Sequence, residues 1–384
     1  MDVLIVGAGP AGLMAAEILA FRGRKVTLVD SKASFGRKFL MAGKSGLNIT
    51  NDQELAKFIS RFGNDQKKLE PMLTSFGPKK VKKWVQALGQ EIFIGSTGRV
   101  FPTTMKASPL LRLWLKRLLS LGVEFKMNYK LVDWHDSFVF DTPSGKKFLT
   151  PKTTILALGG ASWPKLGSDG SWAKIFKTKK IKVNCFAPSN VGVRINWSKF
   201  MNQFHGIPVK NIQMCSDNLN TRGEALVTKE GLEGGGIYEL SPALRKGAIL
   251  KIDLFPDITL ESLAIKLSRN RKKNSISNYL RKTLSLSGVR LALINEFIRP
   301  IPNSPQNLAY SLKNLCLNQQ GAHSIDQAIS TAGGVDFSEL NEHLMILKSP
   351  QVFCVGEMLD WEAPTGGYLI NACLATGYWV GKNV

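Results

Sequence analysis

Residues 2–30 read DVLIVGAGPAGLMAAEILAFRGRKVTLVD. The first six residues form a short apolar strand, and residues 10–22 follow with the apolar spacing of a helix that Gly23 can end. Residues 25–30 form a second apolar strand that closes on Asp30. This stretch therefore predicts a strand–helix–strand unit at the start of an α/β fold.

The glycines of the first turn have the spacing G-x-G-x-x-G. Gly7 allows the tight turn, Gly9 lets the backbone approach a pyrophosphate, and Gly12 lets the helix pack closely on the strand. The helix N-terminus attracts phosphates through its free N–H groups and its dipole. Asp30 can bind the ribose hydroxyls of an adenosine and would repel a 2′-phosphate. The unit predicts FAD or NAD rather than NADP, and a glycine-rich turn in another α/β protein is the alternative.

Composition fits an intracellular enzyme better than a membrane protein or a disulfide protein. The 384 residues suffice for two or three domains, and we see no apolar run of 18 residues. The five cysteines show no C-x-x-C and the four histidines are scattered, so we predict no metal site. The net charge of +22 would attract RNA, anionic lipid or an acidic partner. Because no RNA-recognition motif accompanies that charge, it does not by itself indicate a nucleic-acid-binding protein.

Three later segments also carry cofactor-like patterns. Residues 352–368 predict a strand, a turn with glycines and a helix N-terminus, which would stabilise the negative charge of a reduced flavin. The glycine-rich residues 43–51 offer donors, and a surface loop is the alternative there. Residues 155–160 are an apolar strand that ends in two glycines, which lets the backbone pass close to a cofactor. A second G-x-G-x-x-G is missing from the sequence, so we expect NAD(P)H to bind only transiently or not at all.

These segments together resemble the BaiN-type (HI0933-like) NAD(P)/FAD-dependent oxidoreductases, a family of bacterial flavoproteins. The resemblance covers nearly the whole chain and rests on six stretches. They are GAGPAGL from Gly7, GRVFP at 98–102, TAGGV at 331–335, GEALVT at 223–228, GLEGG at 231–235 and GEMLDWEAPTGGY at 356–368. The last three are typical of a branch of uncharacterised members. The chain departs from the wider pattern at Leu47 and Leu369, so substrates do not transfer safely from better-known members.

The resemblance implies an α/β fold with a glutathione-reductase-type, Rossmann-like FAD-binding domain and inserted β-barrel-like and helical domains. From the patterns along the chain we predict the FAD-binding domain at 1–185 and 324–384. We predict an inserted antiparallel β domain at 186–255 and a helical cap at 256–323. The resemblance also implies a cytoplasmic enzyme with FAD as its cofactor. The oligomeric state stays open.

We predict an FAD-dependent oxidoreductase that moves a hydride between flavin N5 and a small organic substrate, with NAD(P)H as its reductant. The alternatives are an amine or amino-ketone oxidase that produces peroxide, and an RNA-associated flavoprotein. The predicted catalytic residues are Lys44, Arg99 and Tyr368, because each can donate to a developing anion. The predicted cofactor-binding residues are Gly7, Gly9, Ala11, Gly12, Asp30, Lys38, Asn48, Ala157, Gly159, Gly356, Glu357 and Gly367.

Overall fold

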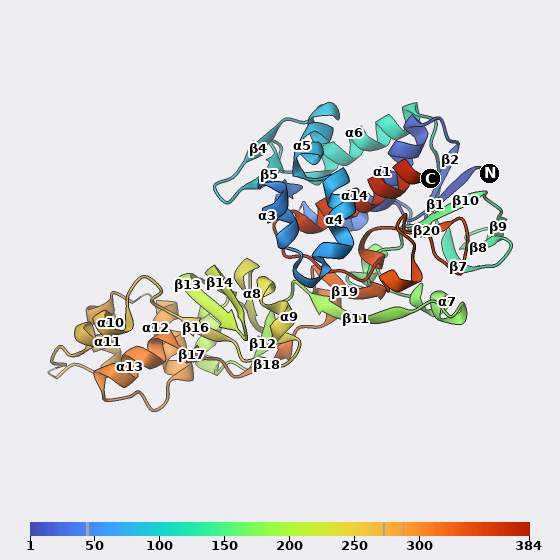
Figure 1. Cartoon of the computed structure of the whole chain (residues 1–384). Helices are drawn as coiled ribbons and strands as arrows, with labels where there is room; N and C mark the ends of the chain where they lie inside the picture. Colours follow the sequence, from blue (N-terminus) through green and yellow to red (C-terminus); the bar gives the residue numbers. More distant parts are fainter. Residues whose placement is uncertain (44–45, 272, 287) are drawn as a thin grey trace. The chain divides into compact units, whose positions relative to one another are not determined.

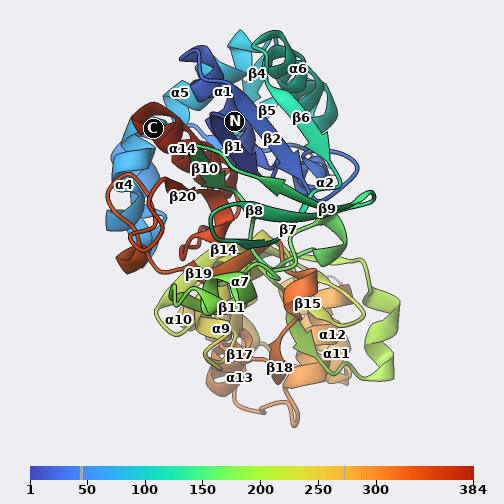
Figure 2. The same cartoon turned by 90° about the vertical axis from the view of Figure 1, so that its right-hand side faces the viewer.

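The computed structural model of the chain describes residues 1–43, 46–271, 273–286 and 288–384. The chain divides into two compact units. The first unit holds Met1–Ala187 and Ser330–Val384, and the insert unit holds Pro188–Ile329. Both termini therefore belong to the first unit, and Figures 1 and 2 show them close together.

A five-stranded parallel sheet is the centre of the first unit, with strand order β20-β10-β1-β2-β6. The middle strand β1 (Val3–Val6) is fully buried, as its unbroken apolar run requires of a parallel strand covered on both faces. It pairs with β2 (Val26–Asp30) and β10 (Thr153–Leu156), so Val6 lies between Val29 and Leu156. The predicted strand–helix–strand unit is confirmed, with α1 (Pro10–Phe21) between β1 and β2.

The remaining elements of the first unit are β6 and β20, which complete this sheet, and the strands, helices and turns outside it. Its other strands are β3 (Thr50–Asn51), β4 (Ile92–Ile94), β5 (Arg99–Pro102), β6 (Glu124–Met127), β7 (Lys130–Trp134), β8 (Phe138–Thr142), β9 (Gly145–Leu149), β11 (Val183–Ser189), β19 (Ser330–Val335) and β20 (Val352–Cys354). Its other helices are α2 (Arg37–Ala42), α3 (Leu55–Ser60), α4 (Gln66–Ser75), α5 (Pro78–Ala87), α6 (Ala107–Ser120), α7 (Ala173–Thr178) and α14 (Tyr368–Asn383). Its 3-10 turns are η1 (Gly63–Asp65), η2 (Pro164–Leu166), η5 (Phe337–Glu339) and η6 (Gly356–Met358).

Helices α1 and α14 come from opposite ends of the chain and lie side by side (Figure 1). Glycine makes their approach possible, because a Cβ at Gly377 would lie 2.2 Å from the carbonyl oxygen of Ala11. A Cβ at Gly381 would likewise lie 2.8 Å from the Cβ of Ile18. The C-terminal helix is thus part of the nucleotide-binding fold.

On its other side, α1 carries a buried carboxylate that the sequence pattern did not indicate. Glu17 is 1% exposed and accepts hydrogen bonds from the indole nitrogens of Trp84 and Trp114, at 3.0 and 2.5 Å. Arg117 Nη1 donates to the second oxygen at 2.9 Å. These bonds and the ion pair offset the cost of burying the charge and tie α1 to α5 and α6.

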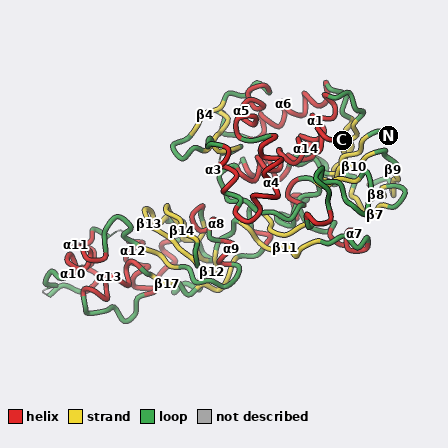
Figure 3. Tube along the Cα trace, in the orientation of Figure 1, coloured by secondary structure: helices red, strands yellow, loops and turns green. Residues whose placement is uncertain are grey.

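The insert unit is built on a seven-stranded antiparallel sheet with the order β17-β16-β13-β14-β15-β12-β18. Its strands are β12 (Val193–Ile195), β13 (Pro208–Ser216), β14 (Leu219–Val227), β15 (Gly231–Glu233), β16 (Lys251–Asp253), β17 (Leu315–Cys316) and β18 (Gln319–Ala322). Its helices are α8 (Gly235–Glu239), α9 (Ser241–Leu244), α10 (Leu260–Leu267), α11 (Ile276–Leu284), α12 (Gly288–Phe297) and α13 (Pro305–Lys313), with 3-10 turns η3 (Lys199–Phe204) and η4 (Ile325–Gln327). Figure 3 shows α10, α11 and α13 gathered at one end of this unit.

Strands and helices of the insert unit share one hydrophobic core, which includes Ile212 on β13 and Leu293 on α12. The first unit has its own core. The expected division of the insert into a β domain (186–255) and a helical cap (256–323) stays a prediction. Among the described residues, no helix has both the length and the apolar character that a membrane span needs.

The α1–α14 contact predicts a strong effect for Gly377→Ala. The added methyl group would overlap the Ala11 carbonyl, and relieving that overlap should cost about 1–3 kcal/mol of unfolding free energy. Urea unfolding followed by circular dichroism measures this loss. Gly223→Ala on β14 is the control, because a Cβ there meets no atom within 4 Å. Equal unfolding midpoints for the two variants would contradict the close packing of α1 on α14.

Candidate functional site

A pocket opens in the first unit where the parallel strands β1, β2, β10 and β20 end. It holds about 870 Å³ of empty space, part of it open to solvent. Parallel α/β sheets bind ligands at this carboxyl edge, where the loops that leave neighbouring strands diverge. Of the residues predicted to bind a cofactor, the lining includes Gly7, Gly9, Ala11, Asp30, Lys38, Ala157, Gly159, Gly356 and Glu357.

The first glycine turn forms the floor of the pocket. Gly7 has φ +107°, and a Cβ there would lie 2.2 Å from the carbonyl oxygen of Ala157. Gly9 is the N-cap of α1, and a Cβ at Gly9 would meet no atom within 4 Å. The helix therefore begins beside open space, which its N-terminal dipole makes favourable for an anion.

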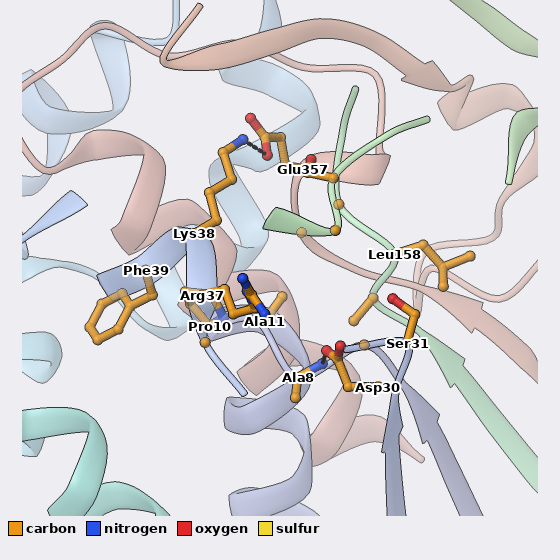
Figure 4. A pocket seen from close by; sticks show the side chains of 18 of the residues that line it. Ala8, Pro10, Ala11, Asp30, Ser31, Arg37, Lys38, Phe39, Leu158 and Glu357 are labelled. Atoms are coloured by element: carbon orange, nitrogen blue, oxygen red, sulfur yellow. Dashed lines mark hydrogen bonds and ion pairs between the residues drawn. The ribbon is translucent and has the colours of Figure 1, made fainter. Parts of the chain in front are cut away.

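Asp30, at the end of β2, faces this turn (Figure 4). Its Oδ2 accepts the backbone N–H of Ala8 at 2.8 Å, and its Oδ1 accepts that of Lys32 at 2.8 Å. Burial raises the pKa of the Asp30 carboxyl above its usual value, against the lowering effect of the two backbone donors. Each carboxylate oxygen can accept a further hydrogen bond, so Asp30 can still bind ligand hydroxyl groups.

Lys38 and Glu357 form an ion pair at the opposite side of the pocket (Figure 4). The Lys38 Nζ lies 2.6 Å from Glu357 Oε2 and also donates to the Ser162 hydroxyl at 2.8 Å. Glu357 Oε1 accepts the backbone N–H of Thr331 at 3.1 Å. The Glu357 side chain is only 7% exposed, so Lys38 and these donors stabilise an otherwise costly buried charge.

Thr331 and Ser162 lie behind the pocket lining and hold Lys38 and Glu357, a role that the sequence reasoning missed. Thr331 Oγ1 accepts the backbone N–H groups of Ala161 and Ser162, at 2.9 and 3.1 Å. A Cβ at Gly160 would lie 2.4 Å from that same oxygen, so this glycine is required for the contact. The paired glycines after β10 and the TAGGV stretch were the available signals, but neither indicated that the two segments meet.

Cys373 on α14 also lines the pocket. Burial, with a smaller contribution from the charge of Glu357, raises the pKa of its thiol to about 12. The thiol is therefore protonated at neutral pH and is a poor nucleophile. Among the described residues, no group of three or more His, Cys, Asp and Glu side chains could hold a metal ion.

Three predicted cofactor residues lie outside the pocket lining. Gly12 packs beneath it, where a Cβ would lie 2.0 Å from the carbonyl oxygen of Gly7. Gly367 is the N-cap of α14 and packs on the backbone of Thr50. A Cβ at Gly367 would lie 2.6 Å from the backbone atoms of Thr50. Asn48 has a buried Oδ1 with no hydrogen-bond partner among the residues that the structure describes.

Of the predicted catalytic residues that the structure describes, neither Arg99 nor Tyr368 lines this pocket. Tyr368 is 3% exposed, stacks on Phe58 with ring centres 4.7 Å apart, and donates its hydroxyl to Gln53 Oε1 at 3.1 Å. Arg99 is exposed on β5, near the N-terminus of α14. Lys44 lies outside the described residues. The catalytic roles of all three stay predictions.

Comparison with known proteins decides the family. A family model, the HI0933-like protein Rossmann domain, matches residues 1–383. The chain belongs to the HI0933-like family. This confirms the resemblance that the sequence motifs indicated, and the protein is accordingly an FAD-dependent oxidoreductase.

Related proteins extend over nearly the whole chain. The ribosomal RNA dihydrouridine synthase of Escherichia coli (strain K12) is 24% identical over 387 residues, which are 96% of this chain and 94% of that protein. The 3-dehydro-bile acid delta(4,6)-reductase of Clostridium scindens is 23% identical over 411 residues, 98% of this chain and 97% of that protein. A Haemophilus influenzae ribosomal RNA dihydrouridine synthase is 24% identical over 405 residues, 98% of this chain and 96% of that protein.

Solved structures share the fold of this HI0933-like protein. A flavocytochrome c3 fumarate reductase in its open conformation has a TM-score of 0.53 and 17% identity, and the match covers 100% of this chain and 77% of that one. The 3-ketosteroid delta1-dehydrogenase of Sterolibacterium denitrificans has a TM-score of 0.53 and 12% identity, with 100% and 98% covered. The predicted α/β fold class is confirmed.

The pocket of this HI0933-like protein fits FAD. Open space beside Gly9 suits a pyrophosphate, and the half-satisfied carboxylate of Asp30 suits ribose hydroxyls. The Ser168 hydroxyl lines the pocket and is buried without a hydrogen-bond partner among the described residues, as a group awaiting a polar ligand would be.

Gly9→Val should therefore remove the flavin without unfolding the protein. The new side chain would enter the space for the pyrophosphate, while no protein atom stands in the way of its Cβ. We expect a colourless purified variant whose circular dichroism spectrum matches that of the wild type freed of flavin. Gly223→Val is the control and should stay fully coloured. Full flavin content in Gly9→Val would disprove the assignment of the pyrophosphate site.

The raised pKa of Asp30 predicts a pH dependence of FAD binding. Protonation removes the charge that favours ribose hydroxyls, so affinity should fall as the pH is lowered, and the fall should begin above the usual aspartate pKa. Asp30→Asn should bind FAD more weakly at neutral pH and lack this dependence, because an amide does not titrate there. The fluorescence of released flavin measures both effects. The exposed Asp141→Asn should behave like the wild type, and an unchanged pH profile in Asp30→Asn would contradict the assignment.

Proposed function

We propose that the protein reduces a carbon–carbon double bond conjugated to a carbonyl group, with NADH or NADPH as the source of electrons. The observation that carries this proposal is a pocket whose groups suit FAD, in a chain related over nearly its whole length to proteins named for such reductions. Dihydrouridine differs from uridine by two hydrogens across a double bond next to a carbonyl. The delta(4,6)-reductase is likewise named for reducing double bonds, in a 3-dehydro-bile acid.

The overall reaction balances as a transfer of two electrons. NAD(P)H loses a hydride and becomes NAD(P)⁺. The substrate gains a hydride at the double-bond carbon farther from the carbonyl and a proton at the nearer carbon. FAD, when bound, carries the hydride between the two.

The residues of the pocket would hold the two halves of FAD separately. Gly7, Gly9 and Ala11 would form the turn and helix start that receive the pyrophosphate, with Arg37 beside them as a positive charge. Asp30 would accept the hydroxyls of the adenosine ribose. Gly12 would support this half indirectly, by letting α1 lie against the first turn.

The flavin half would lie toward the segments that meet at Glu357. Glu357 would accept a hydrogen bond from a hydroxyl group of the ribityl chain. The positive charge of Lys38 would offset the repulsion between that carboxylate and the phosphates of FAD. Ala157, Gly159 and Gly356 would present backbone rather than side chains to the cofactor. Beyond the pocket lining, Asn48, whose Oδ1 has no hydrogen-bond partner among the described residues, and the α14 cap at Gly367 would face the ring.

Among the predicted catalytic residues, the exposed Arg99 is the better candidate for a group that contacts substrate. Tyr368 is buried and its hydroxyl is bonded to Gln53, so its contribution would be to position the start of α14. Lys44 remains a candidate on its sequence position alone.

Anaerobic mixing tests the proposed reaction. We expect NADH or NADPH to bleach the visible flavin absorbance, and an α,β-unsaturated ketone or aldehyde to restore it. Gly9→Val, which should lack flavin, is the blank. Bleaching by an amine or amino ketone, with peroxide formed when air is admitted and no response to either nicotinamide, would identify the oxidase alternative and refute the reductase.

A uridine in ribosomal RNA is the second candidate substrate. The net charge of +22 favours a polyanion, and two full-length relatives are ribosomal RNA dihydrouridine synthases. Cells that lack this protein should then lose a dihydrouridine from ribosomal RNA, as measured by mass spectrometry of nuclease digests. Restoring the wild type, but not Gly9→Val, should restore it. An unchanged dihydrouridine content would remove this candidate and leave small molecules.

A further inference from the structure

A long segment of the insert unit contains basic residues and no acidic ones. Residues 262–295 contain no Asp or Glu, and they form most of α10, α11 and most of α12. The segment carries Lys266, Arg269, Arg271, Lys272, Lys273, Arg281, Lys282 and Arg290. None of the 29 acidic residues of the chain falls within the segment to balance these charges. The segment is therefore locally positive.

The cations of this segment point to solvent rather than to carboxylates. Six of them are exposed: Lys266, Arg269, Arg271, Lys273, Arg281 and Lys282. We call these six residues the basic end of the insert unit. Within the described ranges none of them forms an ion pair, and Arg281 donates to Asn278 Oδ1 at 3.2 Å. Lys266 is on α10, Arg281 and Lys282 are on α11, and the other three cations lie in the segment that joins the two helices. Neighbouring cations of this kind repel one another, and a row of phosphates would relieve that repulsion.

A cavity of about 700 Å³ adjoins the basic end and is lined by Lys266 and Arg290. The Arg290 guanidinium lies over the ring of Phe255 and donates through Nη2 to the carbonyl oxygen of Asn211 at 3.0 Å. Thr283 and Ser285 add hydroxyl groups to the lining. Together these groups can donate hydrogen bonds to the oxygens of a phosphate.

The carboxylate in the same cavity does not cancel this charge. Asp257 is paired with the Arg222 guanidinium and accepts the amide of Asn211 at 2.8 Å. Its pKa is lowered by these two donors, so it stays ionised together with Arg222. Lys266 and Arg290 are the remaining charged groups that line the cavity.

We propose that the basic end binds the phosphate backbone of RNA, with one phosphate seated at the cavity of Lys266 and Arg290. This inference rests on the RNA candidate of the proposed function. It assigns the contact to charge rather than to base recognition, so binding should depend strongly on salt and weakly on sequence.

An anionic membrane surface fits the same segment less well. An interfacial helix needs a continuous apolar face directed at the lipid. The apolar faces of α10 and α11 are instead buried in the core through Leu263, Leu267, Tyr279 and Leu280. The exposed apolar side chains of α10 are Ile265, at 71% exposed, and Leu260 at the start of the helix, at 37%. Two such side chains do not make a continuous apolar face.

Charge reversal at the basic end tests the proposal in the flavin-loaded protein. The variant Lys266→Glu/Arg269→Glu/Lys282→Glu is compared with Lys79→Glu/Lys83→Glu/Lys116→Glu, which changes the net charge equally at exposed lysines of the first unit. Fluorescence anisotropy measures the Kd of a fluorescein-labelled transcript of a ribosomal RNA fragment over a series of salt concentrations. Flavin content and thermal unfolding show that both variants are folded.

We expect the basic-end variant to bind at least about tenfold more weakly and its salt slope to fall by about 2, because each lost phosphate contact removes about 0.7–0.9 from the slope. The control variant should lose less than about threefold. Equal losses in the two variants, or no loss in either, would overturn the proposal. A basic-end variant that keeps RNA binding but no longer binds vesicles with anionic lipid would identify a membrane surface instead.

This experiment separates the surface from the reaction. Dihydrouridine formation that persists unchanged in the basic-end variant would refute the surface and leave the RNA substrate standing. RNA binding at the basic end in a protein that forms no dihydrouridine would support the surface and refute the RNA substrate.

Discussion

The structure depends on the contact of bare backbone with bare backbone at three glycines. At Gly7, Gly12 and Gly377 a Cβ would lie 2.0–2.2 Å from a carbonyl oxygen of a neighbouring segment. These contacts press α1 against β1 and β10 on one side and α14 on the other. The helix therefore begins at the edge of the sheet where four parallel strands end, and its N-terminus opens into the pocket.

Three carboxylates are buried around α1, and two of them lie at the pocket. Glu17, Asp30 and Glu357 are each held by N–H donors from distant segments, and Glu17 and Glu357 are also paired with a cation. The first is closed off by two tryptophans, whereas the other two face the pocket with acceptor capacity left. The two pocket carboxylates are thus hydrogen-bonded within the protein and can still accept hydrogen bonds from a ligand. Because the thiol of Cys373 is protonated, the pocket supplies placement and electrostatics for the cofactor rather than a nucleophile of its own.

The two units differ in what their surfaces can recognise. The first unit concentrates glycines and buried carboxylates at one edge, which suits a dinucleotide. The insert unit concentrates exposed cations on α10, on α11 and in the segment between them, which suits a polyanion of larger size.

The sequence by itself determined the strand–helix–strand unit, the glycine turn, the acid at Asp30 and the family, because each depends on residues within about thirty positions of one another or on contiguous motifs. Of the twelve cofactor residues that the sequence predicted, nine line one pocket in the structure. Only the tertiary structure decided that Lys38 pairs with Glu357, 319 residues away, that Thr331 joins them, and that Tyr368 is buried against Phe58. These partners are chosen by how β10, β20 and α14 pack, and packing between distant segments leaves no periodicity or spacing in the chain from which it could be predicted.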